Sequence, residues 1–206
     1  MPHQPCAILE QLGGVCVLDE AITKFNARAE ALQTTEFRVP RTPGEWQRIY
    51  KSDSKKDYSK LLNAVQPFIQ AVALADPAER DAVASRLSLE SIGILRTFAH
   101  AASVLAVRRE SPSLIGQGLV ALVIFAQVDD LKDVLFYLAT LYHSTTKLGL
   151  DAQTIFREAA SLTSSPVVRR QIEGFPLRSP DATNLRAFNL RETTTKEGFD
   201  YIQDPL

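Results

Sequence analysis

The sequence predicts a mainly α-helical protein, either an irregular helical bundle or a short stack of HEAT-like α-hairpins, with a small C-terminal β-hairpin. Three observations predict this fold. Apolar residues recur every three or four positions through most of the chain, as they do on the buried side of amphipathic helices. Capping residues and prolines stand where these apolar runs begin. The clearest alternation of apolar and polar residues, which is typical of strands, is confined to the last twenty or so residues.

The most apolar part of the chain, residues 113–149, predicts the centre of the core. Residues 114–128 are apolar on nearly every side, which is typical of a buried helix, and the segment is shorter than the ~20 residues of a membrane-spanning helix. Residues 131–148 show one apolar stripe that includes Leu138. A short connection between these helices predicts an antiparallel hairpin. Residues 119–128 could also form a buried strand, because short apolar runs are ambiguous, but few other runs could supply a matching sheet.

Further helices are predicted towards the N-terminus. Within residues 1–18 the pattern is broken by Gly13 and Gly14, and residues 15–18 form either a short strand or the entry into the next helix. A helix is expected over residues 19–32, and another start is expected at Thr42. Residues 58–72 form a strong helical stripe, in which Pro67 must kink or restart the helix because its ring removes a backbone hydrogen bond.

Helix starts are most legible in the second half of the chain. Asp76, Pro77 and Glu79 have the spacing of a capping box with proline at the first helical position. Gly149 suits the left-handed residue that closes a helix. The other predicted starts are Ser88, Ser111-Pro112, Asp129 or Asp130, Asp151 and Ser165-Pro166.

The spacing of these starts is nearly regular. Residues 88–130 and 112–151 cover about 42 and about 39 positions, close to the ~40–47-residue period of HEAT-type helix pairs. Residues 77–174 therefore resemble a short HEAT-like α-solenoid, which implies stacked helical hairpins. An irregular bundle accounts for the same pattern.

The C-terminal part differs in composition. Residues 188–192 and 199–202 alternate on both sides of a turn that ends in glycine, which predicts a β-hairpin packed on the helices. We therefore divide the chain into an N-terminal helical extension with loops (1–56), a helical core (57–177) and a tail (178–206).

Composition excludes some classes of function. With 206 residues and a net charge of −1, the chain is expected to form one domain with no global field towards nucleic acid or a membrane. Residues 38–60 hold seven basic and three acidic side chains, which indicates a solvated surface. No secretory signal is recognised, so Cys6 and Cys16 are expected to be reduced thiols in the cytoplasm, and a disulfide is the alternative.

One short string carries a catalytic pattern. Asp129, Asp130 and Asp133 match the DDxxD motif and resemble the aspartates with which the all-helical isoprenyl-diphosphate synthases hold magnesium against a diphosphate. The resemblance implies a metal-dependent enzyme, but the second acidic motif of that family is absent. Helix capping accounts for the same aspartates. No other catalytic motif, metal-ligand spacing or cofactor-binding pattern is found, so no cofactor is expected.

The helix predicted over residues 131–148 has a second face away from its leucine stripe. Its side chains are amphipathic: Phe136, Tyr137, Thr140, His143 and Ser144. They either pack on a neighbouring helix or line a groove in which aromatic residues anchor a partner. The sequence thus predicts a non-enzymatic protein-interaction module of adaptor, antitoxin or immunity type, whose partner is another protein and whose binding residues include Phe136, Tyr137, Thr140 and His143.

Overall fold

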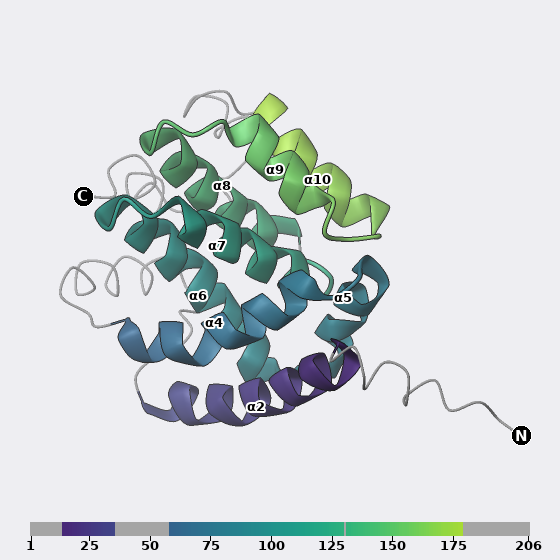
Figure 1. Cartoon of the computed structure of the whole chain (residues 1–206). Helices are drawn as coiled ribbons and strands as arrows, with labels where there is room; N and C mark the ends of the chain where they lie inside the picture. Colours follow the sequence, from purple (N-terminus) through teal and green to yellow (C-terminus); the bar gives the residue numbers. More distant parts are fainter. Residues whose placement is uncertain (1–13, 36–57, 130, 179–206) are drawn as a thin grey trace, which may run out of the picture.

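A computed structural model describes residues 14–35, 58–129 and 131–178 (Figure 1). The described residues are mainly helical and contain no strand, which confirms the predicted fold class in part. The predicted β-hairpin and the helix start at Thr42 lie outside the described residues. The helices are α2 (Gly14–Thr35), α4 (Ser59–Leu74), α5 (Pro77–Val83), the short 3-10 helix η1 (Ala84–Arg86), α6 (Leu89–Arg108), α7 (Pro112–Phe125), α8 (Leu131–Lys147), α9 (Ala152–Ala160) and α10 (Pro166–Arg178).

Helix boundaries follow local chemistry. Asp76 forms the predicted capping box: its carboxylate accepts hydrogen bonds from the first turn of α5, and Glu79 Oε2 accepts from the Asp76 backbone N–H at 3.3 Å. Ser88 and Asp151 likewise accept backbone N–H bonds in the first turns of α6 and α9. Gly149 has φ +68°, the left-handed conformation expected after α8.

The helices lie in two rows. α4, α7 and α9 are neighbours in one row, and α2, α6, α8 and α10 are neighbours in the other (Figure 1). α6 and α7 lie at the centre, because α6 packs on α2, α4, α7 and α8, and α7 packs on α4, α5, α6, α8 and α9. Between residues 91 and 106 of α6, every side chain except Arg96 and Thr97 is buried.

The segment that the sequence placed at the centre of the core is buried as well. α7 is helical through Phe125, so the strand alternative for residues 119–128 is wrong. α7 packs on α8, and Leu138 of α8 is fully buried, as predicted. α4 runs continuously from Ser59 to Leu74 with Pro67 inside it, so the proline does not restart the helix.

Two glycines of α7 differ in how closely other atoms surround them. A Cβ atom on Gly118 would lie 2.7 Å from Leu141 Cδ2 of α8 and 3.3 Å from Ala102 Cβ of α6. The missing side chain therefore permits the close approach of α6, α7 and α8. A Cβ atom on Gly116 would meet nothing within 4 Å.

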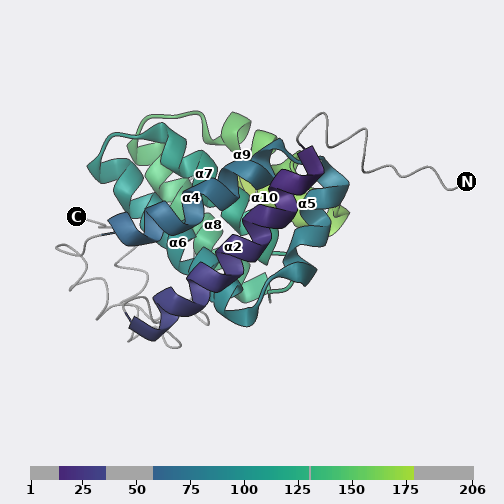
Figure 2. The same ribbon diagram turned by 60° about the horizontal axis from the view of Figure 1, so that its bottom comes forward.

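α2 belongs to the predicted N-terminal extension but shares the core of the other helices. Leu18, Ile22, Phe25 and Ala29 form its buried stripe and join the same apolar cluster as α4 and α6. Figure 2 shows α2 lying diagonally across the helices behind it.

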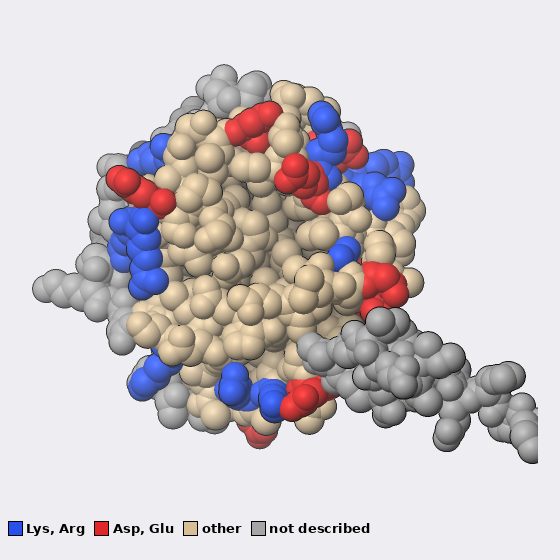
Figure 3. All heavy atoms as spheres, viewed as in Figure 1, with Lys and Arg blue, Asp and Glu red and all other residues tan. Residues whose placement is uncertain are grey.

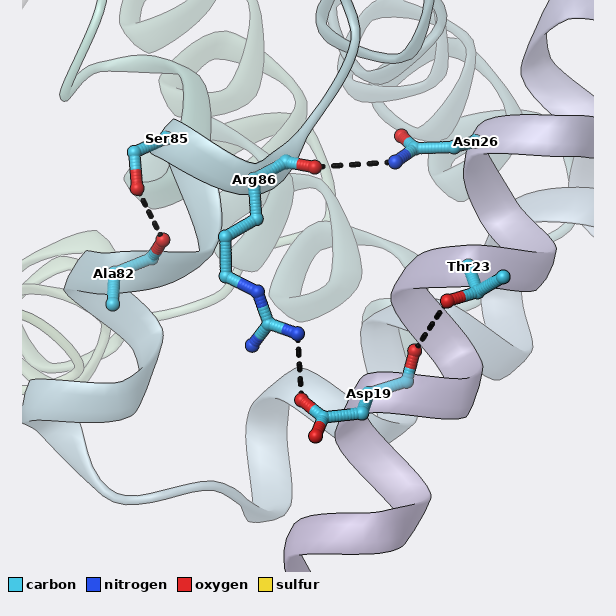
Figure 4. A network of polar contacts seen from close by, with 6 residues as sticks. All are labelled: Asp19, Thr23, Asn26, Ala82, Ser85 and Arg86. Carbon is cyan, nitrogen blue, oxygen red and sulfur yellow. Dashed lines mark hydrogen bonds and ion pairs between the residues drawn. The ribbon is translucent and has the colours of Figure 1, made fainter.

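A polar network fixes α2 against the segment between α5 and α6 (Figure 4). Asn26 Nδ2 donates to the Arg86 carbonyl at 3.1 Å. Asn26 Oδ1 accepts from the Ser88 N–H at 3.2 Å and from Ser91 Oγ at 2.7 Å. An exposed ion pair joins Arg86 Nη2 and Asp19 Oδ1 at 2.6 Å. Asn26 thus connects α2 to η1 through one hydrogen bond and to the start of α6 through two.

Candidate functional site

The predicted binding residues of α8 lie mostly inside the protein. Phe136, Tyr137 and Thr140 are buried, and His143 is half-buried. Tyr137 packs edge-on against Phe125 of α7 with ring centroids 5.0 Å apart. This is the packing alternative of the sequence analysis. That these residues contact a partner stays a prediction, and their burial does not support it.

Two histidines are held in or near their neutral form by this packing. His100 of α6 stacks on Phe136 with ring centroids 6.4 Å apart, and burial lowers the pKa of His100 to about 3. Burial and the nearby Lys147 lower the pKa of His143. His143 Nε2 is enclosed and has no hydrogen-bond partner among the described residues.

The carboxylate of Asp129, the first aspartate of the DDxxD string, forms an ion pair with Arg96. Arg96 Nε donates to Asp129 Oδ2 at 2.7 Å, and Arg96 Nη2 donates to Asp129 Oδ1. The Asp129 side chain is 1% exposed and the Arg96 side chain is 30% exposed, so this bidentate pair is partly buried between α6 and the end of α7. The side chains of Asp130 and Asp133 lie outside the described residues. Within the described part of the chain, no three His, Cys, Asp or Glu side chains gather closely enough to hold a metal ion.

A different surface stands out on the side of the molecule formed by α4 and α7. No charged residue occurs in residues 61–75 or 111–128, which contain nearly all of these two neighbouring helices. Figure 3 shows the result: a wide uncharged area over α4 and α7, with lysine, arginine, aspartate and glutamate side chains around its rim.

The exposed residues of this area, here called the neutral face, come from two helices. Asn63, Pro67, Gln70 and Leu74 recur at spacings of four, three and four, so they form one exposed stripe of α4. Leu74 is 88% exposed. Ser113 and Gly116 of α7 complete the neutral face.

One hydrogen bond joins the two helices beneath this surface. Gln66 Nε2 of α4 donates to Gln117 Oε1 of α7 at 3.0 Å. Both glutamines are half-buried, so the bond fixes the two helices relative to each other.

A groove opens to solvent between α2 and α4, next to the neutral face. Its volume is about 210 Å³. Its floor contains Phe25 and Phe68, whose rings stack with centroids 4.4 Å apart and an interplanar angle of 13°. We call it the α2–α4 groove.

The two walls of the α2–α4 groove differ in charge. The α2 wall carries Glu20, Lys24 and Arg28, one helical turn apart. Lys24 forms an ion pair with Glu20, and its hydrogen bond lowers the pKa of the Glu20 carboxyl. The α4 wall is uncharged and consists mainly of Ala64, Pro67 and Ala71.

The sequence reasoning missed both surfaces, although one signal was available. The charge-free runs 61–75 and 111–128 are visible in the sequence, but residues 114–128 were interpreted as a buried helix and residues 58–72 only as a helix with one apolar stripe. The 4-3-4 stripe of α4, which ends in an exposed leucine, was not recognised as a surface.

Comparisons with protein-family models, with curated proteins and with solved structures find no match. None of the described helices is both long and apolar enough to cross a membrane.

Proposed function

We propose that this protein is a non-enzymatic protein-interaction module that binds its partner through the neutral face. The observation that carries the proposal is the uncharged surface of α4 and α7 in a chain with 47 lysine, arginine, aspartate and glutamate side chains in total, 23 basic and 24 acidic. The centres of protein interfaces are depleted of charged residues, because a charge removed from water must find a partner.

The residues of the neutral face suit this role. Leu74 offers a large apolar side chain that is 88% exposed and can be covered by a partner. Asn63 and Gln70 each provide an amide that both donates and accepts hydrogen bonds. Such a surface can be dehydrated without leaving a charge unpaired.

The two rows of helices support the predicted resemblance to a HEAT-like stack. In this interpretation, which covers residues 77–174, α6 with α7 and α8 with α9 are successive hairpins, and α4 lies beside α7 and extends the row that α7 and α9 form. Stacked hairpins of this kind present such a row as an extended binding surface.

The experiment compares proteins recovered with three forms of the full chain from extracts of its own cells. The neutral-face variant is Gln70→Lys combined with Leu74→Lys. The matched control is Leu89→Lys, because Leu89 on α6 is 86% exposed, nearly as much as Leu74. Circular dichroism checks that all three forms are folded.

We expect at least one protein to be recovered equally with the wild type and the Leu89→Lys control, and about tenfold less with the neutral-face variant. A tenfold loss corresponds to about 1.4 kcal/mol of binding free energy, which two buried lysines exceed. Equal recovery of every protein with all three forms would contradict the proposal.

A further inference from the structure

The size of the α2–α4 groove restricts what it can hold. Its volume of about 210 Å³ is below the ~300–1,000 Å³ of pockets that enclose drug-sized ligands and cofactors. An apolar cavity of roughly 150 Å³ accommodates benzene. The α2–α4 groove therefore has room for one or two side chains of a larger partner that lies along it.

The walls specify the chemistry of that partner. α2 and α4 run in opposite directions, and the groove lies between them (Figure 1). The α4 wall offers only apolar contact, and its two alanines, Ala64 and Ala71, permit close approach of another backbone. The α2 wall offers two cations, of which Lys24 is paired with Glu20. A partner segment must therefore be apolar on one side and acidic on the other.

We propose that the α2–α4 groove binds an acidic amphipathic helix of the partner protein. Lys24 and Arg28 are four residues apart, which separates them by about 6 Å along α2. Carboxylates four residues apart on a docked helix have the same separation, so each can face one cation. The apolar side of the docked helix then covers Pro67 and the two alanines of α4.

The charge pattern of the α2 wall disfavours other anionic partners. Glu20 stands in line with the two cations, so a phosphate backbone or an anionic lipid surface would meet a carboxylate as well. A helix can avoid this repulsion by placing a neutral residue opposite Glu20. The inference rests on the proposed function, because Pro67 belongs to both the groove and the neutral face.

The probe is a fluorescein-labelled peptide of about 18 residues, long enough to be helical, made of alanine with a leucine stripe and glutamates at four-residue spacing along one edge. A second peptide has lysine in place of each glutamate. Fluorescence anisotropy measures binding of both peptides to the full chain and to its Arg28→Glu, Lys24→Glu/Arg28→Glu and Arg109→Glu variants.

We expect saturable binding of the acidic peptide that Arg28→Glu weakens about three- to tenfold, as loss and reversal of an exposed ion pair do. Arg109→Glu removes an exposed cation away from the groove and should leave binding unchanged. The lysine peptide should bind the double variant more tightly than it binds the wild type.

Three results would overturn the inference: absence of saturable binding, binding that Arg28→Glu leaves unchanged, or concentration-dependent dimerisation of the chain that Arg28→Glu abolishes. The last result would assign the groove to a second copy. Failure of the peptide to bind, with a protein still lost from the neutral-face variant, would remove this inference and leave the proposed function standing.

Discussion

At the scale of single residues, Gly116 and Gly118 offer a test of the packing around α7. Alanine is favoured over glycine in a helix by about 1 kcal/mol. Gly116→Ala adds its methyl group in open space, so we expect it to stabilise the protein by about 0.5–1 kcal/mol. Gly118→Ala forces the buried Leu141 side chain away, and overpacking costs about 1–3 kcal/mol. Urea unfolding midpoints should therefore rise for the first variant and stay level or fall for the second. A rise of equal size in both variants would contradict the close contact of α6, α7 and α8.

His100 makes stability depend on pH. Its pKa is about 3 in the folded protein, and an unfolded histidine titrates near 6.5. The unfolded chain therefore gains a proton below about pH 6.5, whereas folded His100 stays neutral until about pH 3. Protonation of His100 in the unfolded chain therefore has no effect on stability above about pH 6.5. Below that pH it lowers the free energy of unfolding by about 1.4 kcal/mol per pH unit.

The measurement is the free energy of unfolding in urea for the wild type and His100→Gln between about pH 7 and about pH 5. His143 and the carboxylates titrate in both proteins, so the difference between the two slopes isolates His100. The wild type should lose stability more steeply than the variant. Parallel slopes would show that His100 is not held neutral by burial.

Asp129 distinguishes a structural role from a metal-binding role. As the partner of Arg96 in a largely buried pair, it accepts two charge-assisted hydrogen bonds. We expect Asp129→Asn to lower the free energy of unfolding by about 1–3 kcal/mol, because the partly buried Arg96 guanidinium loses its counter-charge and one charge-assisted hydrogen bond. Magnesium with pyrophosphate should leave the melting temperature of the wild type unchanged. A saturable magnesium-dependent rise that the variant lacks would favour the diphosphate enzyme instead.

At the scale of elements, we expect the side-chain amide of Asn26 to contribute more to the attachment of α2 than the Arg86–Asp19 ion pair does. The Arg86–Asp19 pair is exposed, with side chains 43% and 55% accessible, so Asp19→Ala should cost less than about 1 kcal/mol. Asn26→Ala removes two part-buried hydrogen bonds and one exposed hydrogen bond and should cost about 1–3 kcal/mol. Hydrogen exchange should accelerate in α2 for Asn26→Ala and change little for Asp19→Ala. Equal effects of the two variants would contradict this ranking.

Elements were predictable where their signals are local. Asp76, Ser88 and Asp151 cap their helices through bonds that span two or three residues, so their spacing in the sequence suffices. The Arg96–Asp129 pair and the bonds of Asn26 to Ser88 and Ser91 join residues 33 to 65 positions apart. No periodic pattern selects such partners, because tertiary packing decides which helices meet.

At the scale of the whole molecule, the difficulty was to distinguish a buried apolar helix from one with an exposed side. The sequence placed the core centre at residues 113–149, where α7 contacts five other helices. It did not single out α6, which packs on four helices and whose alanines allow this close packing. The amphipathic face of α8 was interpreted as a possible groove, yet Phe136 and Tyr137 are buried. The neutral face was missed because the sequence of an uncharged helix does not show which of its sides is exposed until its neighbours are known.

The central claim is that a partner covers the neutral face, and hydrogen–deuterium exchange of the complex tests it most directly. The protein recovered by the wild type and lost by Gln70→Lys/Leu74→Lys is added to the purified chain, and exchange is compared with that of the free chain. We expect slower exchange in α4 and in the first turns of α7, with α9 and α10 unchanged, because covered helices open less often. Protection confined to α9 and α10, with none in α4 or α7, would contradict the claim.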